Sequence, residues 1–131
     1  QGVGIAQAAF EEATKYAKQR KQFGVPISRH QAMGMMIADM ATQVDAARLL
    51  VLRAAVLRDK GKPFSRQSAM AKLYASETST SVTDIAVQIH GGYGYSKAYP
   101  VERYYRDARV TRIYEGTSEI HRMVIARSVL E

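Results

Sequence analysis

The chain has 131 residues, which is enough for one domain with a single hydrophobic core and too few for two ordinary domains. Apolar residues make up 47% of it, which excludes an intrinsically disordered chain, and no run approaches the roughly 20 apolar residues of a membrane helix. The absence of cysteine excludes disulfides, thiolate nucleophiles and thiolate metal sites, and it fits an intracellular compartment. The formal charge of +7 favours an anionic ligand or partner, and a solvated basic surface explains it equally well.

The chain begins with an amphipathic pattern instead of a targeting segment. Its first residues, QGVGIAQAAFEEATKYAKQRK, contain paired acids and no apolar core of a signal peptide. The first residue is not methionine, and Gly2 and Gly4 run directly into a helical pattern. We therefore expect the chain to be part of a longer protein.

The first predicted helix covers residues 4–22. Apolar residues recur there at helical spacing, namely Ile5, Ala8, Ala9, Ala13, Tyr16 and Ala17. The helix is expected to end at Phe23-Gly24-Val25-Pro26. The next stretch predicts a capping box, with Ser28 as the N-cap and Gln31 as the N3 residue.

Two long helices are predicted next. One is an amphipathic pattern that ends at residues 59–61, with Gly61 as the C′ residue and Pro63 beyond it. Its roughly thirty residues span about 45 Å at 1.5 Å per residue, a length typical of a helix bundle. The other helix begins at residue 64 or 65 and ends at His90, although its middle, YASETSTSVTDIA, has weak helix propensity. We expect the small side chains there to let neighbouring backbones approach closely.

The last third of the chain is predicted to contain a loop and two more helices. Residues 91–100, GGYGYSKAYP, have the glycines and tyrosines of a shaped loop, and Pro100 suits the N1 position of a short helix at 101–109. A final helix covers 118–130, and no stretch combines a strand pattern with a partner. The predicted fold class is therefore all-α, an antiparallel four-helix bundle with a short extra helix.

Several kinds of site are disfavoured. The histidines fall at unrelated positions, so we expect no metal site, and no G-x-S-x-G motif supports a hydrolase. Three glycines at 91, 92 and 94 follow a predicted helix, whereas a dinucleotide-binding fingerprint requires a preceding strand. A helix C-cap explains Gly91 easily, but it explains three glycines among tyrosines less well. Arginines 103, 106, 109 and 112 predict a basic ridge, which is either a solvated face or a ligand or subunit contact. Nothing resembles a recognition helix, so we expect no nucleic-acid binding.

One carboxylate stands out in RIYEGTSEI, residues 112–120. Ile113 and Tyr114 precede Glu115, so apolar surroundings could raise its pKa, and Gly116 leaves space for a ligand to approach. Free N–H groups at the start of the following helix could hold a developing oxyanion, and Thr117 or Ser118 could cap it. These parts suit removal of a proton beside a carbonyl. The alternative is a glutamate solvated in a loop.

Five stretches together resemble one family. They are RKQFG (20–24), HQ (30–31), QIHGGYGY (88–95), YPVERYYRDAR (99–109) and IYEGTSEI (113–120). In this order and spacing they are similar to the C-terminal domain of acyl-CoA dehydrogenases over essentially the whole chain. The resemblance implies a flavoprotein of fatty acid metabolism that uses FAD to desaturate acyl-CoA thioesters between the α and β carbons. The family's N-terminal helical and middle β domains are absent from these residues, so we expect the isolated chain to be inactive.

The resemblance also implies roles for single residues. Glu115 matches the base that takes the α-proton while the β-hydrogen leaves as hydride to the flavin, with the Glu115 N–H helping to hold the thioester oxygen and Gly116 lining the same site. Arg20 and Phe23 match positions that touch the cofactor of a neighbouring subunit. The remaining flavin-contacting positions are Gln31, Gln88, Gly91, Gly92, Thr117 and Glu119.

The resemblance leaves some choices open. His90 and Glu119 stand where some relatives have Leu and Gln, while Glu115 favours a short-, medium- or branched-short-chain type. The family implies a homodimer or homotetramer, an electron-transfer flavoprotein as electron acceptor, and a bacterial cytoplasmic or mitochondrial matrix location. Two alternatives remain: an acyl-CoA oxidase domain, in which oxygen takes the electrons, and a non-catalytic helical oligomerisation module.

Overall fold

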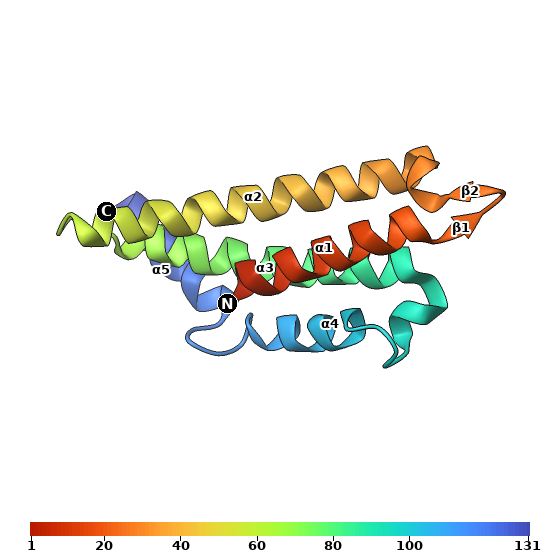
Figure 1. The fold of residues 1–131 in the computed structure, drawn as a ribbon. Coiled ribbons are helices and arrows are strands. Elements are labelled where there is room, and N and C mark those ends of the chain that lie inside the picture. Colours follow the sequence, from red (N-terminus) through yellow and green to blue (C-terminus); the bar gives the residue numbers. More distant parts are fainter.

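The computed structural model describes all residues 1–131 and consists almost entirely of helices (Figure 1). The all-α prediction is therefore confirmed. In chain order the elements are α1 (Gly2–Gln19), β1 (Lys21–Gln22), β2 (Val25–Pro26), the 3₁₀ turn η1 (Ile27–Arg29), α2 (Gln31–Asp59), α3 (Ser65–His90), the 3₁₀ turn η2 (Gly91–Tyr95), α4 (Val101–Val110) and α5 (Ser118–Leu130).

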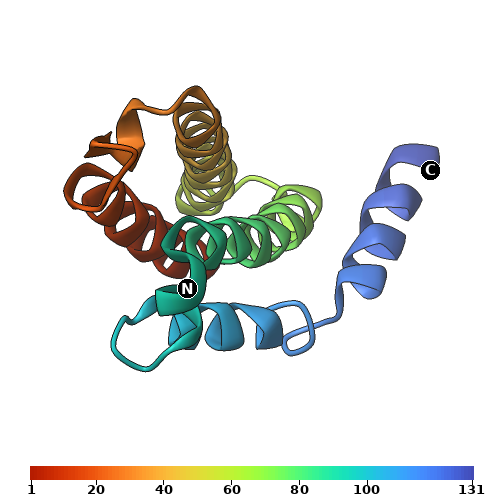
Figure 2. The ribbon, with the colours of Figure 1, turned by 90° about the vertical axis from the view of Figure 1, so that its right-hand side faces the viewer.

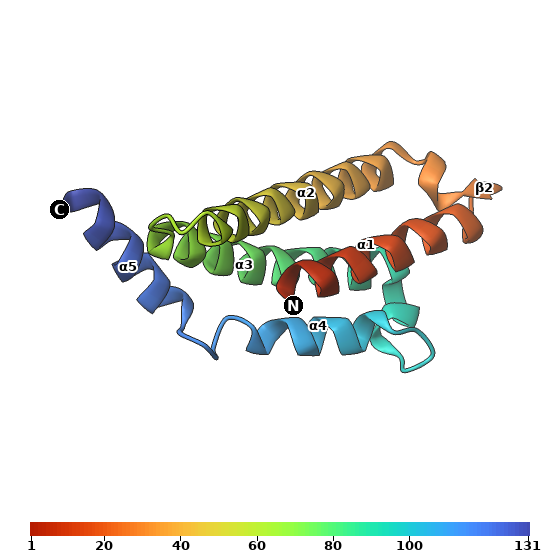
Figure 3. The same ribbon diagram turned by 60° about the vertical axis from the view of Figure 1, so that its left-hand side comes forward.

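The helix α3 is the centre of the arrangement. It packs against α1, α2, α4 and α5, and α4 also packs against α1. The first three helices lie side by side, with the short α4 beneath α1 and α3 (Figures 1 and 2). The last helix, α5, packs chiefly on α3 and points away from the other helices (Figure 3). The sequence predicted the final helix as the fourth main helix of the bundle. In the structure the short α4 packs beside α1 and α3 instead.

Small side chains make up much of the hydrophobic core. Alanines 6, 9, 13 and 17 of α1 are completely buried and face Met40 and Val44 of α2 and Val82 and Ala86 of α3. Buried hydroxyls of α3 are paired within the helix: Ser79 Oγ donates to Ser76 O (2.9 Å) and Thr83 Oγ1 to Ser79 O (2.7 Å). Because these hydroxyls need no partner outside the helix, neighbouring backbones can approach α3 closely.

The connection between α1 and α2 differs from the prediction. Residues 21–26 form a β-hairpin with two-residue strands and a two-residue turn. The first helix therefore ends at Gln19 and not at Gln22. Phe23 and Gly24 occupy its turn with φ of 53° and 81°, the left-handed pair that tight hairpin turns require. The expectation of no strand was wrong here, because the strands are too short for a periodic pattern.

Two predicted caps are also different. Ser28 lies inside η1, and His30 is the N-cap residue of α2 without a side-chain hydrogen bond, so the Ser28–Gln31 capping box was wrong. The 3₁₀ turn takes up the residues that the box would have used. Pro100 is the N-cap of α4 and not its N1 residue, while Thr117 caps α5 by accepting from Ile120 N at 3.4 Å.

Gly94 is predicted to be required for packing. A Cβ there would lie 2.5 Å from Val87 O and 2.9 Å from His90 Cβ, so Gly94→Ala forces η2 away from α3. We expect the free energy of unfolding to fall by about 1–3 kcal/mol in urea denaturation. The control is Gly34→Ala, at an exposed α2 position with nothing within 4 Å, which should be neutral or stabilising by up to about 1 kcal/mol. Equal effects of the two substitutions would contradict this account.

Candidate functional site

The joint between α4 and α5, residues 111–117, is anchored at both ends. Thr111 is buried; its Oγ1 donates to Ala108 O (2.7 Å) and lies 3.3 Å from Ser79 Oγ of α3. At the other end Ser118 N donates to Arg112 O at 3.2 Å, which closes the loop on itself. The joint is therefore attached to the central helix and is not a free linker.

Two consecutive residues of the joint have left-handed backbone conformation. Glu115 has φ of 53° and Gly116 has φ of 90°. Glycine adopts such angles readily, whereas a residue with a Cβ is strained by about 1–2 kcal/mol. Strain of this kind persists only where surrounding contacts hold it, and it concentrates at functional sites.

Side chains from α3 and α5 hold the strained pair. Lys72 Nζ of α3 donates to Gly116 O at 2.6 Å, and His121 Nε2 of α5 donates to Glu115 O at 3.2 Å. Burial lowers the pKa of the Lys72 ammonium, and the nearby Glu115 carboxylate acts in the opposite direction. Neither Lys72 nor His121 was predicted as a site residue. Lys72 lies 44 positions from Gly116, and His121 belongs to no motif that indicates a contact with Glu115.

The Glu115 side chain is exposed in this chain. Ile113 and Tyr114 are exposed as well, so the apolar surroundings expected from the sequence are not provided by these residues. Any desolvation of this carboxylate must come from a surface or ligand that covers the joint.

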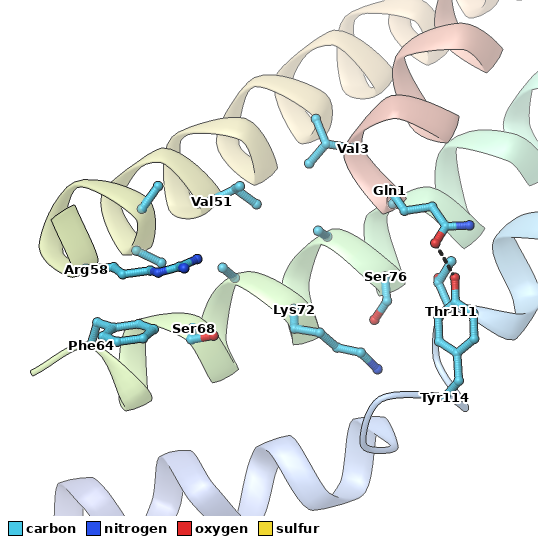
Figure 4. Close-up of a pocket in the computed structure, with 15 residues that line it drawn as sticks. Gln1, Val3, Val51, Arg58, Phe64, Ser68, Lys72, Ser76, Thr111 and Tyr114 are labelled. Carbon is cyan, nitrogen blue, oxygen red and sulfur yellow. Dashed lines mark hydrogen bonds between the residues drawn. The ribbon is translucent and has the colours of Figure 1, made fainter.

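A cavity of about 400 Å³ lies next to the joint (Figure 4). It is bounded by the start of α1, the end of α2, the first half of α3 and the residues Thr111 and Tyr114. Tyr114 Oη donates to Gln1 Oε1 at 2.6 Å across one edge, and Lys72 and Arg58 provide cationic groups in a mostly apolar wall. Glu115 itself does not line this cavity.

Four predicted cofactor residues line a second cavity of about 690 Å³ at the other end of the bundle: Arg20, Gln88, Gly91 and Gly92. The Arg20 guanidinium lies over the Tyr93 ring, 5.6 Å from its centre. Phe23 is 93% exposed at the hairpin turn, and Gln31 is exposed at the start of α2, so neither belongs to this cavity.

The predicted site residues thus form two groups. Glu115, Gly116, Thr117 and Glu119 lie together where α5 begins, and the remaining six lie around the far end of α1. The 18 residues of α1 separate the groups by about 27 Å.

Glu119 is exposed at the start of α5. Hydrogen bonds to its carboxylate from its own backbone N–H and from the Thr117 hydroxyl lower its pKa.

His90 is a further polar group in the wall of the second cavity. Its ring is 2% exposed, stacks on Tyr16 with centres 4.2 Å apart, and donates from Nδ1 to Ala86 O at 2.8 Å. Since Nδ1 carries the proton, Nε2 is an acceptor, and it has no partner in the chain. Burial lowers the pKa of His90. In the sequence, His90 stands out only as a position where some relatives of the family have Leu.

Other classes of site find no support in the geometry. No cluster of three or more histidine, aspartate or glutamate side chains is arranged to hold a metal ion. No helix combines the length and apolarity needed to cross a membrane.

Residues 1–130 match the family model for the C-terminal domain of acyl-CoA dehydrogenases. The chain belongs to the acyl-CoA dehydrogenase family. Over all 131 residues it is 58% identical to the acryloyl-CoA reductase (NADH) of Anaerotignum propionicum and 54% identical to the mitochondrial short-chain specific acyl-CoA dehydrogenase of Bos taurus, covering 33% and 32% of those proteins.

Solved structures of the family have the same fold. Butyryl-CoA dehydrogenase from Megasphaera elsdenii is 49% identical and superimposes with a TM-score of 0.98, over 99% of this chain and 34% of that one. The chain therefore spans about a third of the length of the acyl-CoA dehydrogenase relatives that it matches.

His90 predicts a pH dependence of stability. Because burial disfavours the imidazolium, the folded chain has a His90 pKa below 6.5, and the unfolded chain binds more protons as the pH falls through that range. The free energy of unfolding should therefore decrease from pH 7.5 to pH 5, and His90→Phe, which retains a ring against Tyr16, should reduce that decrease. The measurement is urea denaturation across this range. Ile85→Val, which changes no titratable group of α3, is the control and should keep the wild-type slope. An unchanged slope in His90→Phe would show that His90 does not titrate as described.

Proposed function

We propose that this chain is the C-terminal domain of an FAD-dependent acyl-CoA dehydrogenase in which Glu115 is the catalytic base. The observation that carries the proposal is the strained Glu115–Gly116 pair, held by side chains from two helices at the start of α5. A glutamate that served only solubility would need neither the left-handed backbone nor the two supporting contacts.

The joint has the parts needed for proton abstraction beside a thioester. The Glu115 carboxylate takes the α-proton, and the backbone N–H groups of Glu115 and Gly116 donate to no other backbone group of the chain. They are therefore free to stabilise the oxygen on which negative charge develops. The His121 imidazole fills the position that a Cβ of Gly116 would take, so the space expected there from the sequence is occupied.

The cavity beside the joint suits part of the substrate. Val3, Val51 and Phe64 contribute apolar wall for an acyl or pantetheine chain. Arg58 adds positive charge, which fits the anionic groups of coenzyme A. Tyr114 lines this cavity and directly precedes Glu115, so the cavity lies beside the proposed base.

The second cavity fits the phosphate and adenine portions of FAD. Arg20 supplies a charge for a phosphate, and Gly91 and Gly92 leave open space of at least 4 Å where a Cβ would stand, so a ligand can approach the backbone. When bound, FAD supplies the hydride acceptor of the reaction.

The separation of the two groups supports a shared cofactor site between subunits. Thr117 and Glu119 lie beside Glu115 and would contact the chain's own FAD, whereas Arg20, Phe23, Gln31, Gln88, Gly91 and Gly92 lie about 27 Å away and would contact that of a neighbour. The exposed Phe23 at the tip of the hairpin suits such an intersubunit contact. We infer a homodimer or homotetramer.

The direction of the reaction has a second candidate. Two relatives at 58% and 56% identity are named as an acryloyl-CoA reductase and as a subunit of a caffeyl-CoA reductase–Etf complex, about as similar as the named dehydrogenases. In a reductase Glu115 would return the α-proton. The Etf-complex relative also supports an electron-transfer flavoprotein as redox partner, against oxygen in an oxidase. The bacterial and mitochondrial relatives support a bacterial cytoplasmic or mitochondrial matrix location.

Glu115→Gln is predicted to abolish proton abstraction in the complete enzyme. The amide keeps the size of the side chain but cannot accept the α-proton, so exchange of α-hydrogen in a saturated acyl-CoA should fall by at least about 100-fold. The measurement is loss of α-deuterium by NMR, with acyl-CoA affinity determined in parallel and expected to stay within a few-fold. Glu11→Gln, on the exposed face of α1, is the matched control. Retained exchange in Glu115→Gln would assign the base to another residue.

Arg20→Met is predicted to weaken FAD binding in the complete enzyme. It removes a charge-assisted contact to phosphate, which corresponds to an increase of about 10- to 100-fold in the dissociation constant measured by flavin fluorescence. Lys18→Met removes an exposed cation from the last turn of α1, two residues before Arg20, and should bind FAD normally. Equal affinities of the two variants would remove the second cavity from the cofactor site.

A further inference from the structure

Lys72 is placed to control the backbone of the joint. It lies in the second turn of α3, between buried Ala71 and Ala75, so its Cα position is fixed by the packing of the central helix. Its side chain leaves α3 toward the turn before α5 (Figure 4), and Nζ donates to Gly116 O at 2.6 Å. No carboxylate lies within 4.0 Å of Nζ, so this carbonyl is its hydrogen-bond partner in place of an ion pair.

His121, in the first turn of α5, supports the same joint. Its Nε2 donates to Glu115 O, and its ring stands 3.0–3.7 Å from the point where a Cβ of Gly116 would be. The imidazole therefore occupies the space that glycine leaves. Any larger residue at position 116 would push the ring away and would also have to adopt φ of 90°.

The two contacts fix the peptide planes on both sides of Gly116. The Glu115 carbonyl belongs to the plane between residues 115 and 116, and the Gly116 carbonyl to the next plane. Each trans peptide directs its N–H opposite to its C=O. Holding both carbonyls thus determines φ and ψ of Gly116, the most flexible residue of the joint, and fixes the direction of the Gly116 N–H.

We propose that Lys72 and His121 form a clamp that positions the Glu115 carboxylate and the adjacent Gly116 N–H for reaction, with Lys72 as a positioning residue. This inference rests on the proposed role of Glu115 as base. The clamp acts through the backbone, since Lys72 contacts Gly116 O and not the reacting carboxylate. Through this contact the fixed position of α3 stabilises the left-handed backbone of Glu115 and Gly116, which the turn alone would not favour.

The first test is structural and needs neither substrate nor FAD. The probe is the 131-residue chain labelled with ¹³C and ¹⁵N, and the readouts are the Gly116 carbonyl shift and the hydrogen exchange of the Gly116 and Thr117 amides. Lys72→Met, which keeps an unbranched stem without the donor, should shift the carbonyl signal and speed exchange at least about fivefold, while Lys72→Arg should restore most of both. Lys18→Met is the control with an unchanged joint. An unaltered Gly116 carbonyl in Lys72→Met would overturn the clamp.

The second test measures catalysis in the complete enzyme. Displacement of a positioned group by about 1 Å costs on the order of 100-fold in rate, so Lys72→Met should lower kcat about 10- to 100-fold with KM within about twofold and FAD content unchanged. Lys72→Arg should recover at least a third of kcat. Val82→Ala, a buried position of the same helix, supplies a variant that is destabilised without touching the joint.

The outcomes separate this inference from the proposed function. Wild-type kcat in Lys72→Met, or an equal loss in Val82→Ala, would overturn the positioning role, because the effect would then be absent or a consequence of stability. If Glu115→Gln keeps its α-proton exchange while Lys72→Met still alters the Gly116 carbonyl, the base assignment fails and the clamp remains a structural contact. A drop in kcat reversed by Lys72→Arg, together with the altered carbonyl, supports both.

Discussion

The whole arrangement depends on the burial of α3 on several sides at once. A helix at the centre of a bundle needs side chains small enough for neighbouring backbones to approach, and its buried hydroxyls need hydrogen-bond partners. Alanine, serine and threonine satisfy the first condition in α3, and hydroxyl bonds to carbonyls three or four residues earlier satisfy the second. The same composition that weakens helix propensity in isolation therefore suits this helix to its place.

Both proposed functional regions are attached to the ends of this helix. Lys72 is near the N-terminal end, where it reaches the Glu115 joint, and His90 is the last residue of α3, in the wall of the second cavity. The distance between the regions follows from the helix lengths and cannot be shortened by side-chain movement. In the proposed enzyme, each cofactor site must then be completed by a second subunit, so assembly and activity are linked by the geometry of one helix.

The sequence predicted elements with strong local signals and missed those defined by distant contacts. The ends of α2 and α3, marked by Gly61 and Gly91, and the Thr117 cap of α5 match the structure. The hairpin at 21–26 was missed because Phe23 adopts φ of 53°, which its residue type does not suggest. Motifs drew attention to Glu115, but Lys72 lies 44 positions from Gly116, and nothing in its neighbourhood, AMAKLYA, indicates which carbonyl it meets.

The joint also explains why a glutamate stands where local preference would place glycine or asparagine. In the left-handed region, a Cβ costs about 1–2 kcal/mol, which an unsupported turn would relieve by changing conformation. Here the following residue is glycine, and both adjoining carbonyls are bound by side chains from other helices, so relief would break two hydrogen bonds. The strain is therefore retained by tertiary structure, through the contacts that α3 and α5 make with the backbone of the joint. A backbone held in this way gives the Glu115 side chain a fixed point of attachment, which suits the proposed base, since a base must meet one particular carbon–hydrogen bond.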